Sequence, residues 1–124
     1  LLNNYEVIKM HKSGFKIGVH THSHKPLPFL SKKEQKNEIH NCIIALQNLN
    51  IRTNSIAYPN GLFNEETLAV CKELKLNYGF TTVAGFNRRN FHFLKIKRIG
   101  LNVSDSINVV TLKIVLAYFF NKDE

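Results

Sequence analysis

Three histidines alternate with two hydroxyl residues in the segment His20-Thr21-His22-Ser23-His24. Imidazole nitrogen is a common zinc ligand, and two rings four residues apart in a compact loop can reach one cation at about 2.0–2.1 Å. We therefore predict that His20 and His24 bind a divalent metal, while His22 points elsewhere. Thr21 and Ser23 could orient the rings through hydrogen bonds. Zinc suits these ligands best, although cobalt, nickel, iron and manganese are also possible. The alternative is a solvent-facing loop that binds no metal.

Aspartate and cysteine residues limit the other chemistry of the chain. The only aspartates are Asp105 and Asp123, so a reaction that needs an aspartate in the first hundred residues cannot be carried out by this chain alone. Cys42 and Cys71 lie in separate helical patterns without Cys-x-x-Cys spacing. We expect two buried thiols, with a disulfide between them as the less favoured alternative.

The composition is typical of one folded domain. The chain has 124 residues, of which 44% are hydrophobic and 21% are charged, and its net charge is +8. This charge favours anionic partners such as nucleic acid, wall polymers or a membrane surface, without choosing among them. Phe86, Phe91 and Phe93 lie near Arg88 and Arg89 and could stack on nucleic-acid bases. We prefer a loop that packs its phenylalanines inward, and we expect no nucleic-acid partner.

Helical and extended patterns alternate along the chain. Ser31 and Glu34 form a capping box at the start of the second helix, and Asn64 can cap the third. Ser104 or Asp105 could cap the last helix, although β-branched residues leave a strand possible there. This alternation predicts an α/β fold with parallel strands and helical crossovers. The expected helices cover residues 2–10, 32–48, 65–76 and 107–120, and the expected strands cover residues 15–19, 55–58, 78–82 and 96–101.

Apolar residues at helical spacing define the expected inner faces of three helices. Gly14 is a plausible C-terminal cap of the first. The inner positions are Leu2, Tyr5, Val7, Ile8 and Met10 in the first helix, Ile39, Cys42, Ile43, Leu46 and Leu49 in the second, and Leu68, Cys71, Leu74 and Leu76 in the third. Ligands of parallel α/β folds sit at the carboxyl ends of the strands, so the loops at residues 20–24, 58–61 and 82–87 should meet at one rim.

Several of these segments resemble one enzyme family. The run GFKIGVHTHSHKPL, residues 14–27, resembles the second motif of the polysaccharide deacetylases of the NodB-homology family, His-Ser/Thr-x-x-His after a Gly-x-x-Ile-Gly strand. The run AYPNG, residues 57–61, is similar to the third motif of the branch that has Ala-Tyr-Pro-x-Gly. Residues 78–82 with Gly85, and residues 94–99, are similar to later strands of that branch. The resemblance covers about residues 2–101.

The resemblance implies a distorted (β/α) barrel and a metal-dependent hydrolysis of N-acetyl, or less often O-acetyl, groups on a saccharide. In such enzymes two histidines and one aspartate hold the metal, so His20 and His24 would be the histidine ligands. The backbone amide of Asn60 would stabilise the oxyanion. Tyr58 and Pro59 would contact the substrate, although core packing is an equal alternative for the Tyr58 ring. The family favours the cell envelope or the extracellular space.

One family motif has no counterpart in the chain. The strand with an Asp-Asp pair, which provides the general base and the third metal ligand, would precede Leu1, so we interpret residues 1–124 as a single partial domain that lacks it. A late Leu-x-x-His acid is also missing. A preceding segment would supply the base, or the chain is a non-catalytic carbohydrate-binding or structural remnant. Self-association through an open sheet edge is a further expectation.

The apolar segment at residues 107–120 is too short to cross a bilayer, for which about 20 apolar residues are needed. We expect it to form a buried helix, or one that packs on another subunit.

Overall fold

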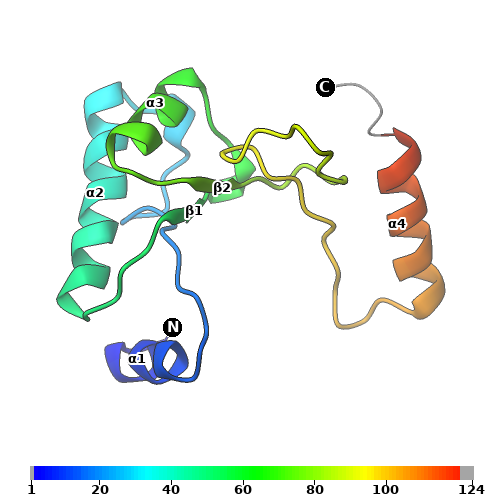
Figure 1. Ribbon diagram of the computed structural model, residues 1–124, viewed down its shortest axis with the longest axis horizontal. Coiled ribbons are helices and arrows are strands. Elements are labelled where there is room, and N and C mark those ends of the chain that lie inside the picture. Colours follow the sequence, from blue (N-terminus) through cyan, green and yellow to red (C-terminus); the bar gives the residue numbers. More distant parts are fainter. Residues whose placement is uncertain (1, 121–124) are drawn as a thin grey trace.

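A small parallel sheet lies at the centre of the computed structural model, which describes residues 2–120 (Figure 1). Strands β1 (Ser55–Ala57) and β2 (Tyr78–Phe80) pair in parallel. A parallel bridge between Val19 and Ile56 adds one segment beside β1, and a parallel bridge between Phe80 and Ile96 adds another beside β2. The segments therefore follow one another across the sheet in chain order, and the expected parallel α/β arrangement is confirmed.

The strands expected over residues 15–19 and 96–101 are wrong as continuous strands. Each contributes only one bridge residue, Val19 in the first and Ile96 in the second. Among the described residues each outer segment has a sheet neighbour on one side only. The carboxyl ends of all four segments still point the same way.

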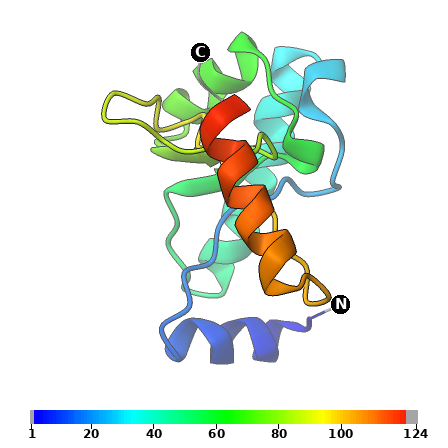
Figure 2. The same ribbon diagram turned by 90° about the vertical axis from the view of Figure 1, so that its right-hand side faces the viewer.

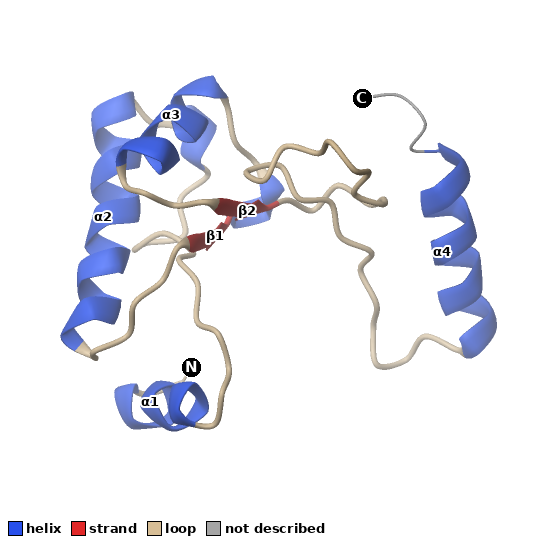
Figure 3. Ribbon diagram, viewed as in Figure 1, coloured by secondary structure: helices blue, strands red, loops and turns tan. Residues whose placement is uncertain are grey.

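Two helices, α2 (Lys32–Asn48) and α3 (Glu65–Glu73), cover one face of this sheet (Figure 3). The capping box at the start of α2 is confirmed, because the Glu34 amide donates to the Ser31 hydroxyl at 3.4 Å and the Ser31 amide donates to the Glu34 carboxylate at 2.9 Å. Asn64 caps α3, as predicted. The helices are α1 (Asn4–Lys12), α2 (Lys32–Asn48), α3 (Glu65–Glu73) and α4 (Ile107–Phe120), and the 3-10 turns are η1 (Leu27–Phe29) and η2 (Pro59–Gly61).

The core lies between the sheet and the helices α2 and α3. The inner faces predicted for these helices are confirmed, with every member buried or partly buried. A polar contact also joins the two helices: the Thr67 hydroxyl donates to the side-chain oxygen of Gln35 at 2.6 Å, and the Gln35 amide group donates to the Leu30 carbonyl at 3.1 Å. Both side chains are fully buried, so this contact fixes how α2 and α3 meet.

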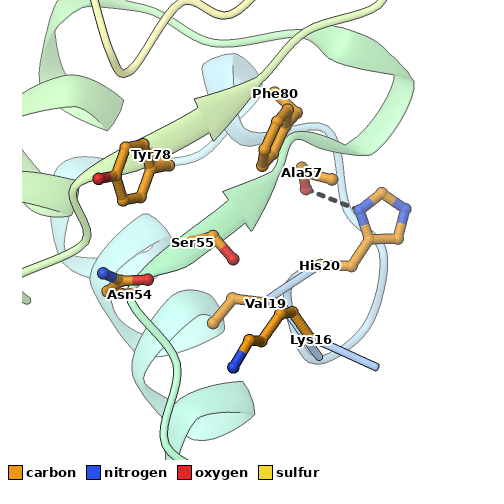
Figure 4. A pocket seen from close by; sticks show the side chains of 9 residues that line it. Lys16, Val19, His20, Asn54, Ser55, Ala57, Tyr78 and Phe80 are labelled. Atoms are coloured by element: carbon orange, nitrogen blue, oxygen red, sulfur yellow. Dashed lines mark hydrogen bonds between the residues drawn. The ribbon is translucent and has the colours of Figure 1, made fainter. Parts of the chain in front are cut away.

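The opposite face of the sheet is uncovered. Side chains alternate along each segment, so Val19 and Ile56 point into the core while His20, Ala57 and Phe80 point away from it. The residues on this second face line an open pocket (Figure 4). The pocket ends at His20, which connects the uncovered face to the rim of the sheet.

Helix α1 packs weakly. It contains no buried residue, and Tyr5, a predicted inner position, is 72% exposed. Leu2, just before the helix, is also exposed. The predicted inner face of this helix is therefore wrong for Leu2 and Tyr5, whereas Val7, Ile8 and Met10 are partly buried and Val7 packs against the core. Gly14 follows the C-cap residue Ser13 with a φ of +96°.

Helix α4 stands apart from the sheet and from the other helices (Figures 1 and 2). It is a helix and not a strand, but Ala117 is its only buried side chain among those described, so the expectation of a buried helix is wrong for this chain by itself. The cap is Ser106, whose hydroxyl accepts from the Val109 amide at 3.4 Å, and neither Ser104 nor Asp105. Asp105 instead pairs with Lys113.

Two further findings concern the whole described chain. Both cysteines are free; Cys71 is buried, as expected, whereas Cys42 is only partly buried. Within residues 2–120, no helix combines the length and the apolar character needed to cross a membrane.

Candidate functional site

His20 is held by the backbone of the neighbouring segment. Its Nδ1 atom lies 2.7 Å from the carbonyl oxygen of Ala57, the last residue of β1 (Figure 4). Because a carbonyl oxygen can only accept, Nδ1 must carry the proton, and in the neutral ring Nε2 keeps its lone pair. Histidine ligands of metals are usually oriented in this way, with one ring nitrogen bonded to a carbonyl and the other free to coordinate.

His24 brings a second imidazole to the same place. The ring centroids of His20 and His24 are 4.8 Å apart, with an angle of 72° between the ring planes. Residues 20–24, the histidine loop, curve back on themselves because Thr21 and His24 have φ angles of +61° and +58°. The left-handed region is unfavourable for a β-branched residue and costs on the order of 1–3 kcal/mol. Such strain is typical of functional loops.

The Thr21 side chain is buried, and its hydroxyl oxygen has no hydrogen-bond partner among the described residues. The hydrogen bonds that we predicted from Thr21 to the histidine rings are therefore not formed in this structure. Ser23 bonds elsewhere, because its hydroxyl donates to the Glu38 carboxylate at 2.7 Å.

Glu38 on α2 anchors the histidine loop. Its carboxylate accepts from the amides of Ser23 and His22, at 2.8 and 3.2 Å, as well as from the Ser23 hydroxyl. Burial acts to raise the pKa of Glu38, but these hydrogen bonds outweigh it, so the pKa lies below its usual value. We did not predict this residue from the sequence. It lies on α2, outside the loop, and no motif spacing connects it with Ser23.

The turn η2 forms the second wall of the site. Asn60 is exposed and has a φ of +55°, and the Gly61 amide donates to the Tyr58 carbonyl at 2.8 Å. The Thr82 hydroxyl donates to the Asn60 carbonyl at 3.3 Å. Together with the bond from His20 to Ala57, these contacts bring the loops after three sheet segments to one rim, as predicted.

Gly61 lies where η2 contacts the loop that follows β2, and this position requires glycine. Its φ is +73°, and a Cβ atom there would overlap the side chain and backbone of Thr82. A larger residue at this position would push η2 away from the loop that follows β2.

Tyr58 and Pro59 lie in the core. The Tyr58 side chain is 1% exposed, and its hydroxyl donates to the Leu94 carbonyl at 2.9 Å. Its ring packs on Phe63, with centroids 5.0 Å apart. Burial raises the pKa of this phenol well above its usual range. Neither side chain offers an exposed surface for stacking on a sugar, and for Tyr58 the structure shows the core packing that the sequence had left open.

A third protein ligand is not provided by residues 2–120, where no three side chains of histidine, cysteine, aspartate or glutamate are grouped so that they could hold a metal. Asp105 is engaged elsewhere: hydrogen bonds from the Asn102 amide and from Lys113 lower its pKa. The described part of the chain therefore brings together two imidazole rings, those of His20 and His24.

Comparisons with known proteins agree with this arrangement. A family model described as polysaccharide deacetylase matches residues 3–79, and the chain belongs to this family. The match includes the histidine loop and η2. A search of curated proteins gave no match.

Two solved structures are similar to the chain. One is the Streptococcus pyogenes deacetylase PplD in complex with acetate, with a TM-score of 0.82 and 27% identity, over 91% of this chain and 50% of that one. The other is the deacetylase domain of BpsB from Bordetella bronchiseptica, with a TM-score of 0.70 and 18% identity, over 79% of this chain and 48% of that one. The second likeness shows the fold alone. The chain spans about half the length of these deacetylases.

Proposed function

We propose that this chain supplies two histidine ligands to a metal-dependent deacetylase site that hydrolyses N-acetyl, or less often O-acetyl, groups on a saccharide. One observation carries the proposal: the His20 and His24 rings lie 4.8 Å apart, with His20 oriented by the Ala57 carbonyl. Membership of the polysaccharide deacetylase family supports the substrate class. The family also favours a saccharide of the cell envelope or the extracellular space.

Imidazole nitrogens are suitable zinc ligands, but two protein ligands are fewer than a catalytic zinc site uses. Catalytic zinc commonly has three protein ligands and one position for water. His20 and His24 would provide two of these ligands, and polypeptide outside residues 1–124 would provide a carboxylate ligand and the general base. A divalent cation, when bound, polarises an acetyl carbonyl and lowers the pKa of an attacking water.

The remaining residues of the site would position the substrate and stabilise charge. The Asn60 amide would donate to the acetyl oxygen as it becomes negative, a role that a main-chain donor can perform whatever its side chain. The hydrogen bond between Gly61 and Tyr58 holds this turn in shape. Because the side chains of Tyr58 and Pro59 are buried, these residues would serve substrate binding through the turn that they build.

Calorimetric titration of the chain with zinc tests the proposal. We expect binding of one zinc per chain that is lost in His20→Ala and in His24→Ala. His22→Ala is the matched control, because this exposed ring lies in the same loop and is not a predicted ligand. Binding that survives both ligand substitutions, or no binding in the unsubstituted chain, would contradict the metal site. A chain that binds no zinc would fit a non-catalytic saccharide-binding or structural remnant.

Acetate release from acetylated oligosaccharides tests whether the general base lies outside this chain. We expect none from the 124-residue chain with zinc, because the general base is not among its assigned residues. Zinc-dependent release by this chain would show that its own residues supply the base.

A further inference from the structure

A cluster of aromatic side chains lies at the opposite end of β2 from the histidine loop. Tyr78 begins the strand, and its ring contacts Phe93 edge to face, with centroids 5.9 Å apart. Phe93 also contacts Phe91, with ring centroids 4.8 Å apart. Tyr78 is 40% exposed and Phe93 57% exposed, so the inward packing expected for Phe93 is wrong. The next residue, Leu94, is buried, and both residues belong to a turn.

The backbone that carries these rings is fixed. The Gly79 amide donates to the Phe93 carbonyl at 2.8 Å, and the Lys95 amide donates to the His92 carbonyl at 2.7 Å. The Leu94 amide donates to Nδ1 of His92 at 3.1 Å. A segment held in this way loses little freedom when a ligand binds, which favours affinity.

These aromatic side chains line a pocket together with polar groups. Lys72 and Asn77 form part of its wall, and His92 contributes a ring whose Nδ1 is already an acceptor, so that Nε2 carries the proton in the neutral form. No aspartate or glutamate is among the residues that line it. The described contacts of Lys72 include no ion pair. The pocket therefore combines apolar ring faces with hydrogen-bond donors and one unpaired cation, a combination that suits a neutral or anionic ligand rich in acceptors.

We propose that this pocket, lined by Lys72, Tyr78, Phe91, His92 and Phe93, is a second saccharide-binding site that holds N-acetylated units of a polymer. Rings at its surface pack against the apolar face of a hexose, and the lysine, histidine and asparagine groups donate to hydroxyl and acetyl oxygens. A deacetylated unit carries an ammonium group at neutral pH. Lys72 repels that charge, and no carboxylate in the lining compensates, so the site discriminates against the product of deacetylation.

Tyr78 gives this site a physical connection with the proposed reaction. It lines the aromatic pocket and also the open pocket that ends at His20. A polymer bound at the aromatic pocket therefore lies next to the face of the sheet that leads to the histidine loop. The inference rests on the proposed function for its substrate class but does not require the metal ligands.

Calorimetric titration of the 124-residue chain with a hexamer of N-acetylglucosamine, and with the corresponding hexamer of glucosamine, tests the site. At low ionic strength we expect the acetylated hexamer to bind about fivefold more tightly. Phe93→Ala should weaken its binding about tenfold, because an aromatic contact is lost. Phe29→Ala removes a phenylalanine that is 82% exposed and does not line the pocket, so it should change nothing.

Two further variants separate this inference from the metal site and from net charge. Lys72→Gln should bring the affinities for the two hexamers close together, whereas Lys33→Gln, which removes the same charge outside the pocket, should not. His20→Ala should leave hexamer binding intact even where it abolishes zinc binding. The site is overturned if the acetylated hexamer does not bind, if Phe93→Ala binds it as tightly as the unsubstituted chain, or if Lys72→Gln keeps the full preference for it.

Discussion

The Glu38 carboxylate accepts hydrogen bonds from both the amide and the hydroxyl of Ser23, at 2.8 and 2.7 Å, and thereby ties α2 to the histidine loop. The two candidate metal ligands lie on either side of residues that are bonded to a helix of the core. The geometry of the proposed metal site thus depends on a residue that contacts no metal itself.

Replacing Glu38 by glutamine should loosen this loop. We expect Glu38→Gln to lower the free energy of unfolding by about 1 kcal/mol at neutral pH, because charge-assisted bonds at a partly exposed site are lost. The pKa of Glu38 is lowered in the folded state, so its contribution is present above the unfolded pKa and disappears as the pH falls through the folded pKa. Urea unfolding of both proteins at neutral pH and at strongly acidic pH measures the difference. An equal difference at both pH values would contradict the assignment.

Tyr58→Phe tests the buried phenol. We expect the free energy of unfolding to fall by about 1–2 kcal/mol, because phenylalanine cannot donate a hydrogen bond to the Leu94 carbonyl. Burial, followed by the Cys71 thiol, raises the folded pKa of Tyr58 above its ordinary 10.0. The unfolded chain therefore ionises first, and stability falls as the pH rises above about 10. In Tyr58→Phe this alkaline loss should be smaller. Unfolding curves of the unsubstituted chain and of Tyr58→Phe at neutral and alkaline pH measure this loss. An equal loss of stability in the two proteins would contradict the prediction.

Gly61→Ala tests the contact between η2 and the loop after β2. We expect destabilisation of about 2 kcal/mol or more, because the new Cβ overlaps Thr82 and the φ of +73° is unfavourable for alanine. The matched control is Gly100→Ala, where a Cβ has open space and no left-handed φ, so a change within about 0.5 kcal/mol is expected. Thermal unfolding of both variants is the measurement. Similar melting temperatures for the two variants would exclude a tight contact at Gly61.

Thr67→Val tests the polar contact between α2 and α3. Valine has nearly the shape of threonine but cannot donate to the buried oxygen of Gln35, which now receives a bond at 2.6 Å. The same hydroxyl also accepts from the Asn64 amide at 3.1 Å, at the start of α3. We expect a loss of about 1–3 kcal/mol. In the double variant Gln35→Leu with Thr67→Val part of this loss should be recovered, since the buried side-chain oxygen of Gln35 is removed together with its donor, although the Leu30 carbonyl and the Asn64 amide then lose their side-chain partners. Additive losses in the double variant would argue against a direct contact.

The features predicted correctly have local causes. The start of α2 follows from a capping box formed by Ser31 and Glu34, and the buried faces of α2 and α3 follow from helical periodicity. The position of His20 at a strand end follows from the apolar run before it. Its pairing with Ala57 could not be read from spacing, because the two residues are 37 positions apart.

The features missed depend on contacts between distant segments. The strand predicted over residues 96–101 is limited to a bridge at Ile96, since a strand lasts only as long as its neighbour pairs with it. Glu38 carries no motif, and its role depends on where α2 crosses the histidine loop. The burial of Tyr58 depends equally on tertiary contacts, because Gly79 leaves room for its hydroxyl to reach Leu94.

The uncovered sheet face and the separate α4 have a thermodynamic consequence. The chain has an accessible surface of 8959 Å², whereas a compact protein of 14.3 kDa has about 6,800 Å². The unfolded chain would expose about 20,700 Å², so unfolding this chain by itself exposes roughly 15% less new surface than is usual for its size. The heat capacity change of unfolding and the dependence of stability on urea both scale with that surface. Both should therefore be low for a chain of this length, and the stability curve correspondingly flat with temperature.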